Sequence, residues 1–336
     1  MPEQHGIKGK LQRACQALPP VLRLAHTPND VGLYTVDEVD RRVISRPFSL
    51  QTGIPTVDGY MKPVMPGEVI FVEAFTSNGK TAFMQFWSRS IVKQLDKRPT
   101  TKDVVVYVSW ETLVEELGLY DLCGMTGIDA SAAWYGNITK QEQADLRLAA
   151  CQRACMPIWV LGHSLKRRRE QTDLTLSAVR KALFQMEETY NVRPAIIFLD
   201  YLQIITPETG GEDRRIQVMR SVDAIQRMAR DCGAPVVVGC QAGRQVMGRE
   251  FKLPEIGDGQ ETSRIEQDAD KVLALWYPCK SESMGAMIIP LNLAVSERLM
   301  VMGIRKQRHA ASGQVFPLDF DAAHNTFATW NGAVEG

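Results

Sequence analysis

The stretch 73–87, EAFTSNGKTAFMQFW, decides how the chain is understood. An apolar run, VIFVEA, ends at Ala74, a small polar loop follows, and Gly79-Lys80-Thr81 opens a segment with helical character. A strand, a loop ending in Gly-Lys-Thr and a helix form the setting in which backbone N–H groups and a helix N-terminus bind phosphates. The consensus GxxxxGK[ST] is met at each position except the first, where Ala74 replaces glycine.

This loop predicts a nucleotide site with two side chains in defined roles. Lys80 is expected to reach the β and γ phosphates, and the Thr81 hydroxyl is expected to bind Mg²⁺. The other residues predicted to surround the nucleotide belong to the same loop: Ala74, Thr76, Ser77, Asn78, Gly79 and Ala82. The alternative is that Gly-Lys-Thr is a chance tripeptide at a helix start, so the rest of the chain has to decide.

Composition sets few limits on the class of protein. The chain has 336 residues, of which 45% are apolar, as is ordinary for a soluble globular protein with a sizeable core. Its 39 Lys and Arg residues balance 39 Asp and Glu residues, so the whole-molecule charge gives no reason to expect a polyanionic partner. Any nucleic-acid contact has to be local.

The cysteines indicate a reduced compartment. The seven cysteines include no CxxC pair and no His-rich neighbour, which argues against a zinc site and a disulfide framework. Apolar runs fall short of the roughly 20 residues that span a bilayer, and the first residues, MPEQHGIKGK, lack the apolar core of a signal peptide. We therefore expect a cytoplasmic protein with no membrane partner.

The organisation of the chain changes near residue 50. Residues 1–50 hold two short helix-like patches, KGKLQRACQAL and VDEVDRRVIS, and are too few to form a core of their own. From about residue 67, apolar runs alternate with amphipathic segments expected to be helical from Gly79, from about Thr112 and near 140–155, 175–190 and 213–231. The runs expected to be strands are VIFVEA, VVVYVSW, IWVLGH, AIIFLDYLQII, VVVGCQ, KVLALWY and, as the last strand, LMVMGI.

This alternation predicts an α/β fold with a mainly parallel central sheet flanked by helices. We expect an amino-terminal arm over residues 1–50, one α/β domain over 51–330 and a tail over 331–336.

Polar side chains close three of the predicted strands. Asp200 ends AIIFLD, where a buried carboxylate is costly unless it serves a site such as Mg²⁺. Glu111 follows VVVYVSW and is expected to orient or deprotonate an attacking water, although a helix N-terminal glutamate would also explain it. Gln241 ends VVVGCQ, where its amide can sense a γ-phosphate. Because ligands of open α/β sheets bind beyond the carboxyl ends of the strands, we expect these groups and Lys80 to share one site.

Six motifs together resemble those of a known family. They are PGEVIFVEAFTSNGKTAF, VVYVSWE, IIFLDYLQ, VVVGCQAGR, SRIEQDADKVLALWY and IRKQRHAASGQVFPLDFD. In order and approximate spacing, over about residues 50–328, they resemble the motifs of DnaB-type replicative helicases. IEQDAD and the late KQR are not shared by phosphate-loop ATPases in general. The family also accepts alanine at the first loop position, as at Ala74.

The resemblance implies a RecA-like ATPase core that forms a ring, usually a hexamer, with ATP and Mg²⁺ between neighbouring subunits. One subunit would supply five residues of each site: Lys80, Thr81, Glu111, Asp200 and Gln241. Of these, Thr81 and Asp200 would serve the metal. Lys306 and Arg308 of RKQR would reach the γ-phosphate of the neighbour's ATP, because a guanidinium supplied in trans stabilises the transferring phosphoryl group. Without the resemblance, RKQRH would be taken as a solvated basic strand end.

Two departures limit what the resemblance implies. Only about 50 residues precede the core, so we expect the family's amino-terminal helical domain, which meets primase, to be absent. The helix expected around 36–45 is a candidate linker helix that docks on a neighbour. Before IEQDAD, the family has an Arg-Glu-Ser-Gly run that touches DNA, whereas this chain has QETSR at 260–264. Gln260 replaces the expected arginine, which leaves open whether Gln260, Glu261 and Arg264 contact DNA.

Other basic residues are candidates for contacts with single-stranded DNA. Arg244, Arg249 and Lys252 lie in GRQVMGREFK, directly after Gln241, where a loop can face a central pore. The run KRRR at 166–169 and TPETGGEDRR at 206–215 are better explained as solvated turns. Since no aromatic residue interleaves these patches, we expect contacts to the DNA backbone that are blind to base sequence.

The sequence favours an ATP-driven, ring-forming helicase that translocates on single-stranded DNA and unwinds duplex. Its compact form suggests a replication protein of a phage, plasmid or other mobile element, with a primase or a helicase loader as candidate partners. Two alternatives stay open: a RecA-like ATPase that forms rings or filaments without unwinding, and a scaffold ring in which ATP only sets assembly. Glu111, Lys306 and Arg308 favour turnover, whereas Gln260 favours the scaffold.

Overall fold

The computed structural model describes residues 31–36 apart from residue 33, 50–95, 102–167, 173–208, 213–259 and 263–332. The chain divides into two compact units, Met1–Ser49 and Leu50–Gly336. The predicted helical patch at 8–18 lies outside the described residues, as does the predicted linker helix at 36–45 apart from residue 36. The fold below is therefore that of the second unit.

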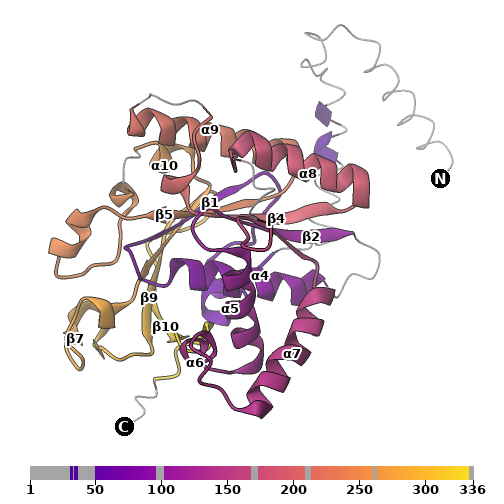
Figure 1. Cartoon of the computed structure of the whole chain (residues 1–336). Coiled ribbons are helices and arrows are strands. Elements are labelled where there is room, and N and C mark those ends of the chain that lie inside the picture. The colour runs from indigo at the N-terminus through magenta and orange to yellow at the C-terminus, as the bar shows by residue number, and fades with distance from the viewer. Residues whose placement is uncertain are drawn as a thin grey trace, which may run out of the picture. The chain divides into compact units, whose positions relative to one another are not determined.

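A nine-stranded sheet with the order β11-β10-β9-β6-β1-β5-β4-β2-β3 forms the centre of this unit (Figure 1). The parallel part consists of β1 (Val69–Ala74), β2 (Asp103–Ser109), β3 (Ile158–Gly162), β4 (Arg193–Asp200), β5 (Val236–Gln241) and β6 (Lys271–Trp276). Beside β6, the sheet continues with the antiparallel strands β9 (Leu299–Gln307), β10 (Val315–Asp321) and β11 (Thr326–Thr329). The carboxyl ends of the parallel strands therefore lie along one edge of the sheet, and β1 is the middle strand in the order.

Helices cover both faces of the sheet (Figure 1). One layer contains α8 (Leu176–Tyr190), α9 (Arg214–Cys232) and the short α10 (Ser263–Asp268). The other contains α4 (Lys80–Leu95), α5 (Val114–Thr126), α6 (Ala130–Trp134) and α7 (Lys140–Cys155). Smaller elements are α3 (Pro55–Tyr60), a two-stranded hairpin of β7 (Met287–Ile288) and β8 (Leu293–Ala294), and the 3-10 turns η3 (Leu202–Ile204), η4 (Arg244–Gly248), η5 (Ile256–Asp258), η6 (Pro278–Lys280) and η7 (Ile289–Leu291).

Burial explains why the strands are apolar on both faces. Every residue of β1 is buried, because the helical layers enclose the sheet from both sides. The largest core cluster joins the strands to α8 and α9, with Phe71 and Val106 packed in the same cluster as Leu183 and Val222.

A buried ion network holds part of the opposite helical layer together. Asp121 of α5 accepts hydrogen bonds from Arg89 of α4 at 2.8 Å and from Arg153 of α7 at 2.9 Å. Arg89 also donates to the backbone carbonyl of Asn325, beside β11. Since each charge has a partner, the network joins three helices to the far edge of the sheet without an unpaired buried charge.

The predicted α/β architecture is confirmed, with two differences in detail. The predicted strand AIIFLDYLQII ends at Asp200, and its LQI residues form η3. LMVMGI is not the last strand, because β10 and β11 follow it. In β10, intermediate and buried residues alternate and Pro317 interrupts the sequence, so it lacks the continuous apolar run by which the buried strands were predicted.

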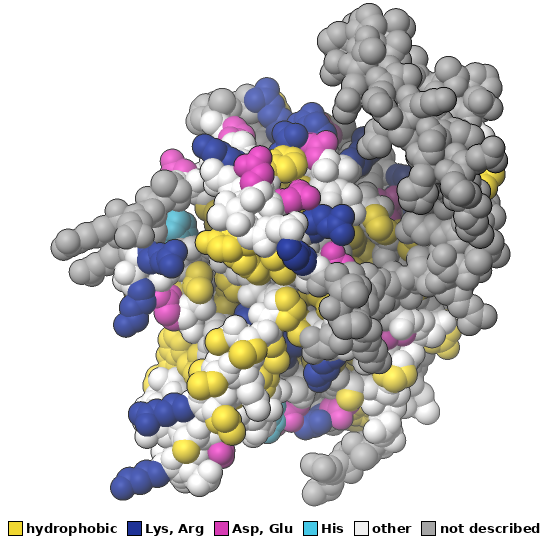
Figure 2. Space-filling model, turned by 90° about the vertical axis from the view of Figure 1, so that its right-hand side faces the viewer, with side chains coloured by type: hydrophobic (Ala, Val, Ile, Leu, Met, Phe, Trp, Pro, Cys, Tyr) yellow, Lys and Arg dark blue, Asp and Glu magenta, His cyan; other side chains and the backbone are white. Residues whose placement is uncertain are grey.

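Charged and hydrophobic side chains share the surface, and the described cysteines are unpaired with one another. On the face shown in Figure 2, Lys and Arg side chains are interspersed with Asp and Glu side chains, and hydrophobic side chains gather in patches between them. The six cysteines in the described part of the chain are free thiols. Among the described helices, none combines the length and apolar character needed to cross a bilayer. Within the described ranges, His, Cys, Asp and Glu side chains form no group of three or more arranged to hold a metal ion.

Candidate nucleotide site

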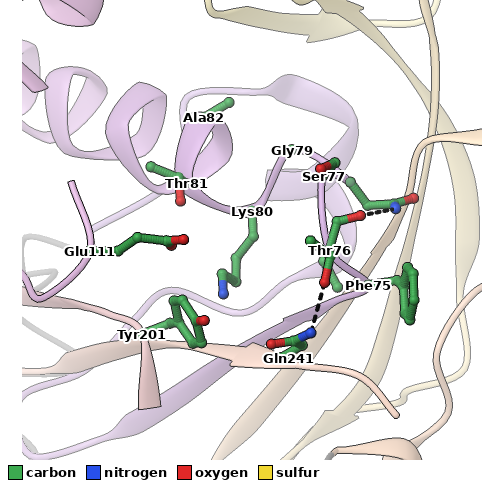
Figure 3. A pocket seen from close by; sticks show the side chains of 12 residues that line it. Phe75, Thr76, Ser77, Gly79, Lys80, Thr81, Ala82, Glu111, Tyr201 and Gln241 are labelled. Atoms are coloured by element: carbon green, nitrogen blue, oxygen red, sulfur yellow. Dashed lines mark hydrogen bonds between the residues drawn. The ribbon is translucent and has the colours of Figure 1, made fainter. Parts of the chain in front are cut away.

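A pocket opens at the carboxyl edge of the parallel strands, in front of the loop between β1 and α4 (Figure 3). Its volume is about 290 Å³, near the lower end of the roughly 300–1,000 Å³ typical of small-molecule sites. The lining residues are Ala74, Phe75, Thr76, Ser77, Asn78, Gly79, Lys80, Thr81, Ala82, Glu111, Tyr201 and Gln241. All the loop residues predicted to surround a nucleotide therefore face one cavity.

The loop is fixed by its own side chains and by the sheet. Asn78 is buried, and its Oδ1 accepts a hydrogen bond at 2.7 Å from the backbone amide that follows β6. Its Nδ2 donates to the carbonyl of Thr76 at 3.0 Å. Gly79 has a φ of +77°, and a Cβ there would lie 2.8 Å from Met300 of β9. Glycine is favoured at this turn by its left-handed backbone, whereas the nearest atom to a Cβ would be the flexible end of the Met300 side chain.

Lys80 extends from the first turn of α4 into the pocket. Its Nζ lies 3.5 Å from the centroid of the Tyr201 ring, a distance at which a cation is attracted to an aromatic face. Its stem lies against Gly239 of β5, where a Cβ would come within 3.0 Å of it. Burial lowers the pKa of the Lys80 ammonium from its ordinary value, against the attraction of Asp200 and Glu111. A phosphate would supply the counter-charge that a buried ammonium needs.

Glu111 and Gln241 approach the same space from two other strand ends (Figure 3). Glu111 lies two residues beyond β2, and its exposed side chain points toward the hollow beside Lys80. Gln241 ends β5, and its Nε2 donates to Thr76 Oγ1 at 2.7 Å. This bond connects a predicted phosphate sensor directly to the phosphate loop.

Asp200 lies behind the pocket lining and is fully buried at the end of β4. Its Oδ2 accepts a hydrogen bond from the Tyr107 hydroxyl at 3.0 Å. Its Oδ1 is buried and has no hydrogen-bond partner among the described residues. A carboxylate oxygen left without a donor, together with the Thr81 hydroxyl, fits the hard oxygen ligands and the water shell of Mg²⁺.

Lys306 and Arg308 lie elsewhere in the subunit. In the sheet register, Val272 of β6 pairs with Lys306, and Phe71 of β1 pairs with Val272, so Lys306 is level with the first half of β1. Arg308 is about 15 Å along the strands from the phosphate loop, at roughly 3.3 Å per residue. Its guanidinium lies 3.3 Å from Asp270 and bonds the carbonyl of Gln267 at the end of α10. Neither cation is among the residues that line the pocket in this chain.

The residues predicted to bind DNA differ in their contacts within the chain. Arg249 forms a bidentate pair with Asp258, with contacts of 2.5 and 2.7 Å, and Lys252 pairs with Glu282. Arg244 is exposed at the start of η4 and has no hydrogen bond or ion pair within the described ranges. Gln260 and Glu261 lie outside the described residues, as does the Arg264 side chain. Their contact with DNA stays a prediction.

Sequence reasoning missed four side chains at or near the site. Phe75 and Tyr201 line the pocket, and Tyr107 bonds Asp200. Glu73, one residue before the phosphate loop, is fully buried, and both of its carboxylate oxygens lack partners in the described structure. Burial and the nearby Asp258 raise the pKa of Glu73 well above its ordinary value. An acidic residue inside the run VIFVEA was the available signal for Glu73, whereas a tyrosine in a buried strand resembles core.

Comparisons with known proteins agree with this arrangement. The sequence model of the DnaB-like helicase C-terminal domain matches residues 49–329. The chain is 27% identical over 226 residues to the replicative DNA helicase DnaB of Mycoplasma genitalium, covering 67% of this chain and 45% of that protein. It is 27% identical over 252 residues to the replicative DNA helicase DnaC of Bacillus subtilis, covering 74% and 52%. The chain thus spans about half the length of these curated relatives.

Solved structures share the fold. One of them, an isolated ATPase domain, superposes with a TM-score of 0.73 at 21% identity, covering 91% of this chain and all of that one. A DnaB-like replicative helicase, studied with its primase interactions, has a TM-score of 0.71 at 20% identity, covering 91% of this chain and 68% of that one. The match of the family model covers most of the chain and includes the whole pocket, so the chain belongs to the DnaB-like helicases, through the C-terminal domain of that family.

Proposed function

We propose that this protein is an ATP-dependent, ring-forming replicative helicase that translocates on single-stranded DNA and unwinds duplex. The observation that carries the proposal is the separation of the pocket from the cations Lys306 and Arg308 within one subunit. Such a site needs a cation on the γ-phosphate. Because Lys306 and Arg308 of the same chain lie away from the pocket, a neighbouring subunit would supply the cation. This arrangement favours a ring, for which we propose the usual six subunits.

The residues of the pocket support hydrolysis. Lys80 and the loop line the pocket, where Lys80 would hold the β and γ phosphates and the loop amides would bind them. Thr81 and Asp200 would hold Mg²⁺, which when bound would supply positive charge beside the phosphates. Glu111 faces the open side of the pocket, where it can orient the attacking water and accept its proton. Arg308 of the adjacent subunit would stabilise the charge of the transferring group.

Gln241 offers a route from the nucleotide to the DNA. Its side chain bonds Thr76 in the phosphate loop, and the segment that follows it carries Arg244 and the turns η4 and η5. A change at the γ-phosphate would therefore reach this segment through one residue. We propose that this segment faces single-stranded DNA in the ring, with Arg244 as the cation available for a phosphate.

The wider partners follow from the relatives. The related helicases are named as replicative proteins, and one of the similar structures is described with its primase interactions. We propose that this chain likewise works in DNA replication, with a primase or a loader as partner.

The test is a pair of assays on the purified chain. ATP hydrolysis is measured with and without single-stranded DNA, and strand displacement is measured on a forked duplex. We expect DNA-stimulated hydrolysis and ATP-dependent unwinding, both abolished by Lys80→Ala, since no other described side chain lining the pocket carries a positive charge. Wild-type turnover in the Lys80→Ala protein would contradict the assignment of the pocket.

A second candidate is a nucleotide-dependent DNA-binding ring, or a RecA-like ATPase, that does not unwind. One observation favours it: among the three cations of residues 243–252 proposed for DNA, Arg249 and Lys252 form ion pairs within the chain itself. DNA-stimulated hydrolysis without strand displacement would select this candidate.

A further inference from the structure

Within the described ranges, the hydroxyl of Tyr107 makes the one side-chain hydrogen bond to Asp200. Tyr107 lies in β2, and the register pairs Tyr107 with Phe198 and Ser109 with Asp200, so the tyrosine reaches the carboxylate from the adjacent strand. The distance from the hydroxyl oxygen to Oδ2 is 3.0 Å. The Tyr107 ring is stacked on Phe198, with centroids 5.9 Å apart and planes inclined by 18°. The direction of the hydroxyl is thus fixed by packing.

A tyrosine at this buried position lowers stability unless its hydroxyl forms a hydrogen bond. Tyr107 is only 2% exposed and lies in the run DVVVYVS, where the other interior positions are valine. A buried hydroxyl without a hydrogen bond is destabilising, and a phenylalanine would fill the space without that cost. A phenol hydroxyl carries its proton at neutral pH, so Tyr107 is a hydrogen-bond donor to Asp200.

The two oxygens of Asp200 are consequently unequal. Oδ2 is occupied by the tyrosine, whereas Oδ1 is buried and without a partner in the described structure. A hydrogen bond to one oxygen prevents the carboxylate from turning about its Cβ–Cγ bond. We propose that Tyr107 is a positioning residue of the nucleotide site, whose hydroxyl orients Asp200 so that Oδ1 faces the water shell of Mg²⁺. This inference rests on the proposed ATPase function.

Tyr107→Phe removes the hydroxyl and keeps the stacked ring, so it is the variant that tests the role. We expect the Mg²⁺ concentration for half-maximal hydrolysis to rise about tenfold, the size expected when a hydrogen bond to a charged group is lost. Binding of a fluorescent ATP analogue is measured in parallel. Its affinity in EDTA should stay within about twofold of the wild-type value, while the gain in affinity on adding Mg²⁺ should shrink.

Tyr277→Phe is the matched control. Tyr277 is also buried at 5% exposure, and its hydroxyl donates to the backbone carbonyl of Glu297 instead of to Asp200. Each variant removes one hydroxyl from a buried tyrosine and keeps the ring, so Tyr277→Phe measures the loss of such a hydrogen bond away from Asp200. Only Tyr107→Phe should change the dependence on Mg²⁺.

The outcomes separate the inference from the function on which it rests. If the wild-type chain neither binds nor hydrolyses ATP, the proposed function fails. If the wild type is active and Tyr107→Phe keeps its Mg²⁺ dependence, or loses affinity equally in EDTA and Mg²⁺, Tyr107 is a core residue and the inference alone fails. Tyr107→Met, which refills the volume without a hydroxyl, repeats the comparison if Tyr107→Phe is poorly folded. Failure of both variants to fold would also assign Tyr107 to the core.

Discussion

Single residues of this chain have their properties set by where strands end. Glu111 is exposed beyond β2 and faces a pocket, whereas Glu73 is enclosed inside β1. The first is an exposed carboxylate that we propose as the base, and the second is a carboxyl that burial favours in its protonated form. The same residue type therefore has opposite roles only a few strands apart.

Glu111→Gln should separate binding from turnover. The amide keeps the size of the side chain and loses its basicity, so hydrolysis should fall by about 100-fold or more while affinity for ATP stays within about twofold. Glu116→Gln, in the first turn of α5 and outside the pocket lining, is the control and should keep wild-type turnover. If binding and turnover fall together in Glu111→Gln, measured by a fluorescent nucleotide and by phosphate release, the glutamate has a structural role.

Glu73→Gln should change how stability depends on pH. The pKa of Glu73 in the folded chain lies well above its ordinary value of 4.5, so between these two values the folded state holds a proton that the unfolded state has lost. Stability of the wild type should therefore fall as pH rises through this window, by an amount that the glutamine variant does not share. The melting temperature of Glu73→Gln minus that of the wild type should increase as pH rises from 5 to 8. Parallel curves would show that Glu73 does not titrate differently on folding.

At the scale of elements, hydrogen bonds and ion pairs of charged side chains stabilise the segment between β5 and α10. The carboxylate of Asp258 binds Arg249 and accepts the amide of Glu255 at 2.7 Å, and the Asp258 carbonyl accepts the amide of Gly243. Arg305 of β9 donates to the carbonyl of Pro254 at 2.7 Å. The proposed DNA-facing segment is thus attached to the strand that leads to Lys306 and Arg308.

Asp258→Asn should loosen this segment without emptying the pocket. The amide cannot form the bidentate pair with Arg249, and hydrogen bonds to charged groups contribute about 1.5–3 kcal/mol. Hydrogen exchange across 243–259 should therefore speed up by about tenfold or more, while ATP affinity is unchanged. Asp319→Asn, which breaks the partly exposed pair with Arg298, serves as the control. Unchanged exchange in Asp258→Asn would mean that backbone contacts alone hold the segment.

Most elements were predictable from sequence, and the exceptions have physical reasons. Continuous apolar runs marked β1, β2, β4 and β5, because strands buried on both faces carry few polar positions. β10 alternates and contains a proline, so it gave a weaker signal. The loop residues and Glu111 were found because strand ends and Gly-Lys-Thr are local features. Tyr107 was not, because its contact with Asp200 joins residues 93 positions apart and depends on strand order.

At the scale of the whole molecule, the proposed trans site makes a prediction about mixtures. Arg308→Ala should fold and bind ATP through its own Lys80, yet lose on the order of 10³-fold in turnover. Lys80→Ala should also be inactive. Mixed in one ring, the two variants should regain partial activity, because a junction with an intact Lys80 and an intact Arg308 is a complete site.

The control for mixing is a chain that carries both substitutions. Combined with either single variant it can form no complete junction, so it should restore no activity. Mass measurement confirms that mixed rings have formed. If such rings of the two single variants stay inactive, Arg308 does not act across the junction.

The placement of the pocket at one edge of the sheet and of Arg308 toward the other has a further consequence for assembly. A contact that joins these two different patches is heterologous, so subunits add head to tail in one direction. An open row then has one fewer working junction than it has subunits, since the terminal pocket has no donor. Closing the row adds that last junction without adding a chain. The hydrolysis rate per subunit should therefore increase stepwise when the row closes into a ring. A ring that opens to admit a DNA strand should lose one active site until it closes again.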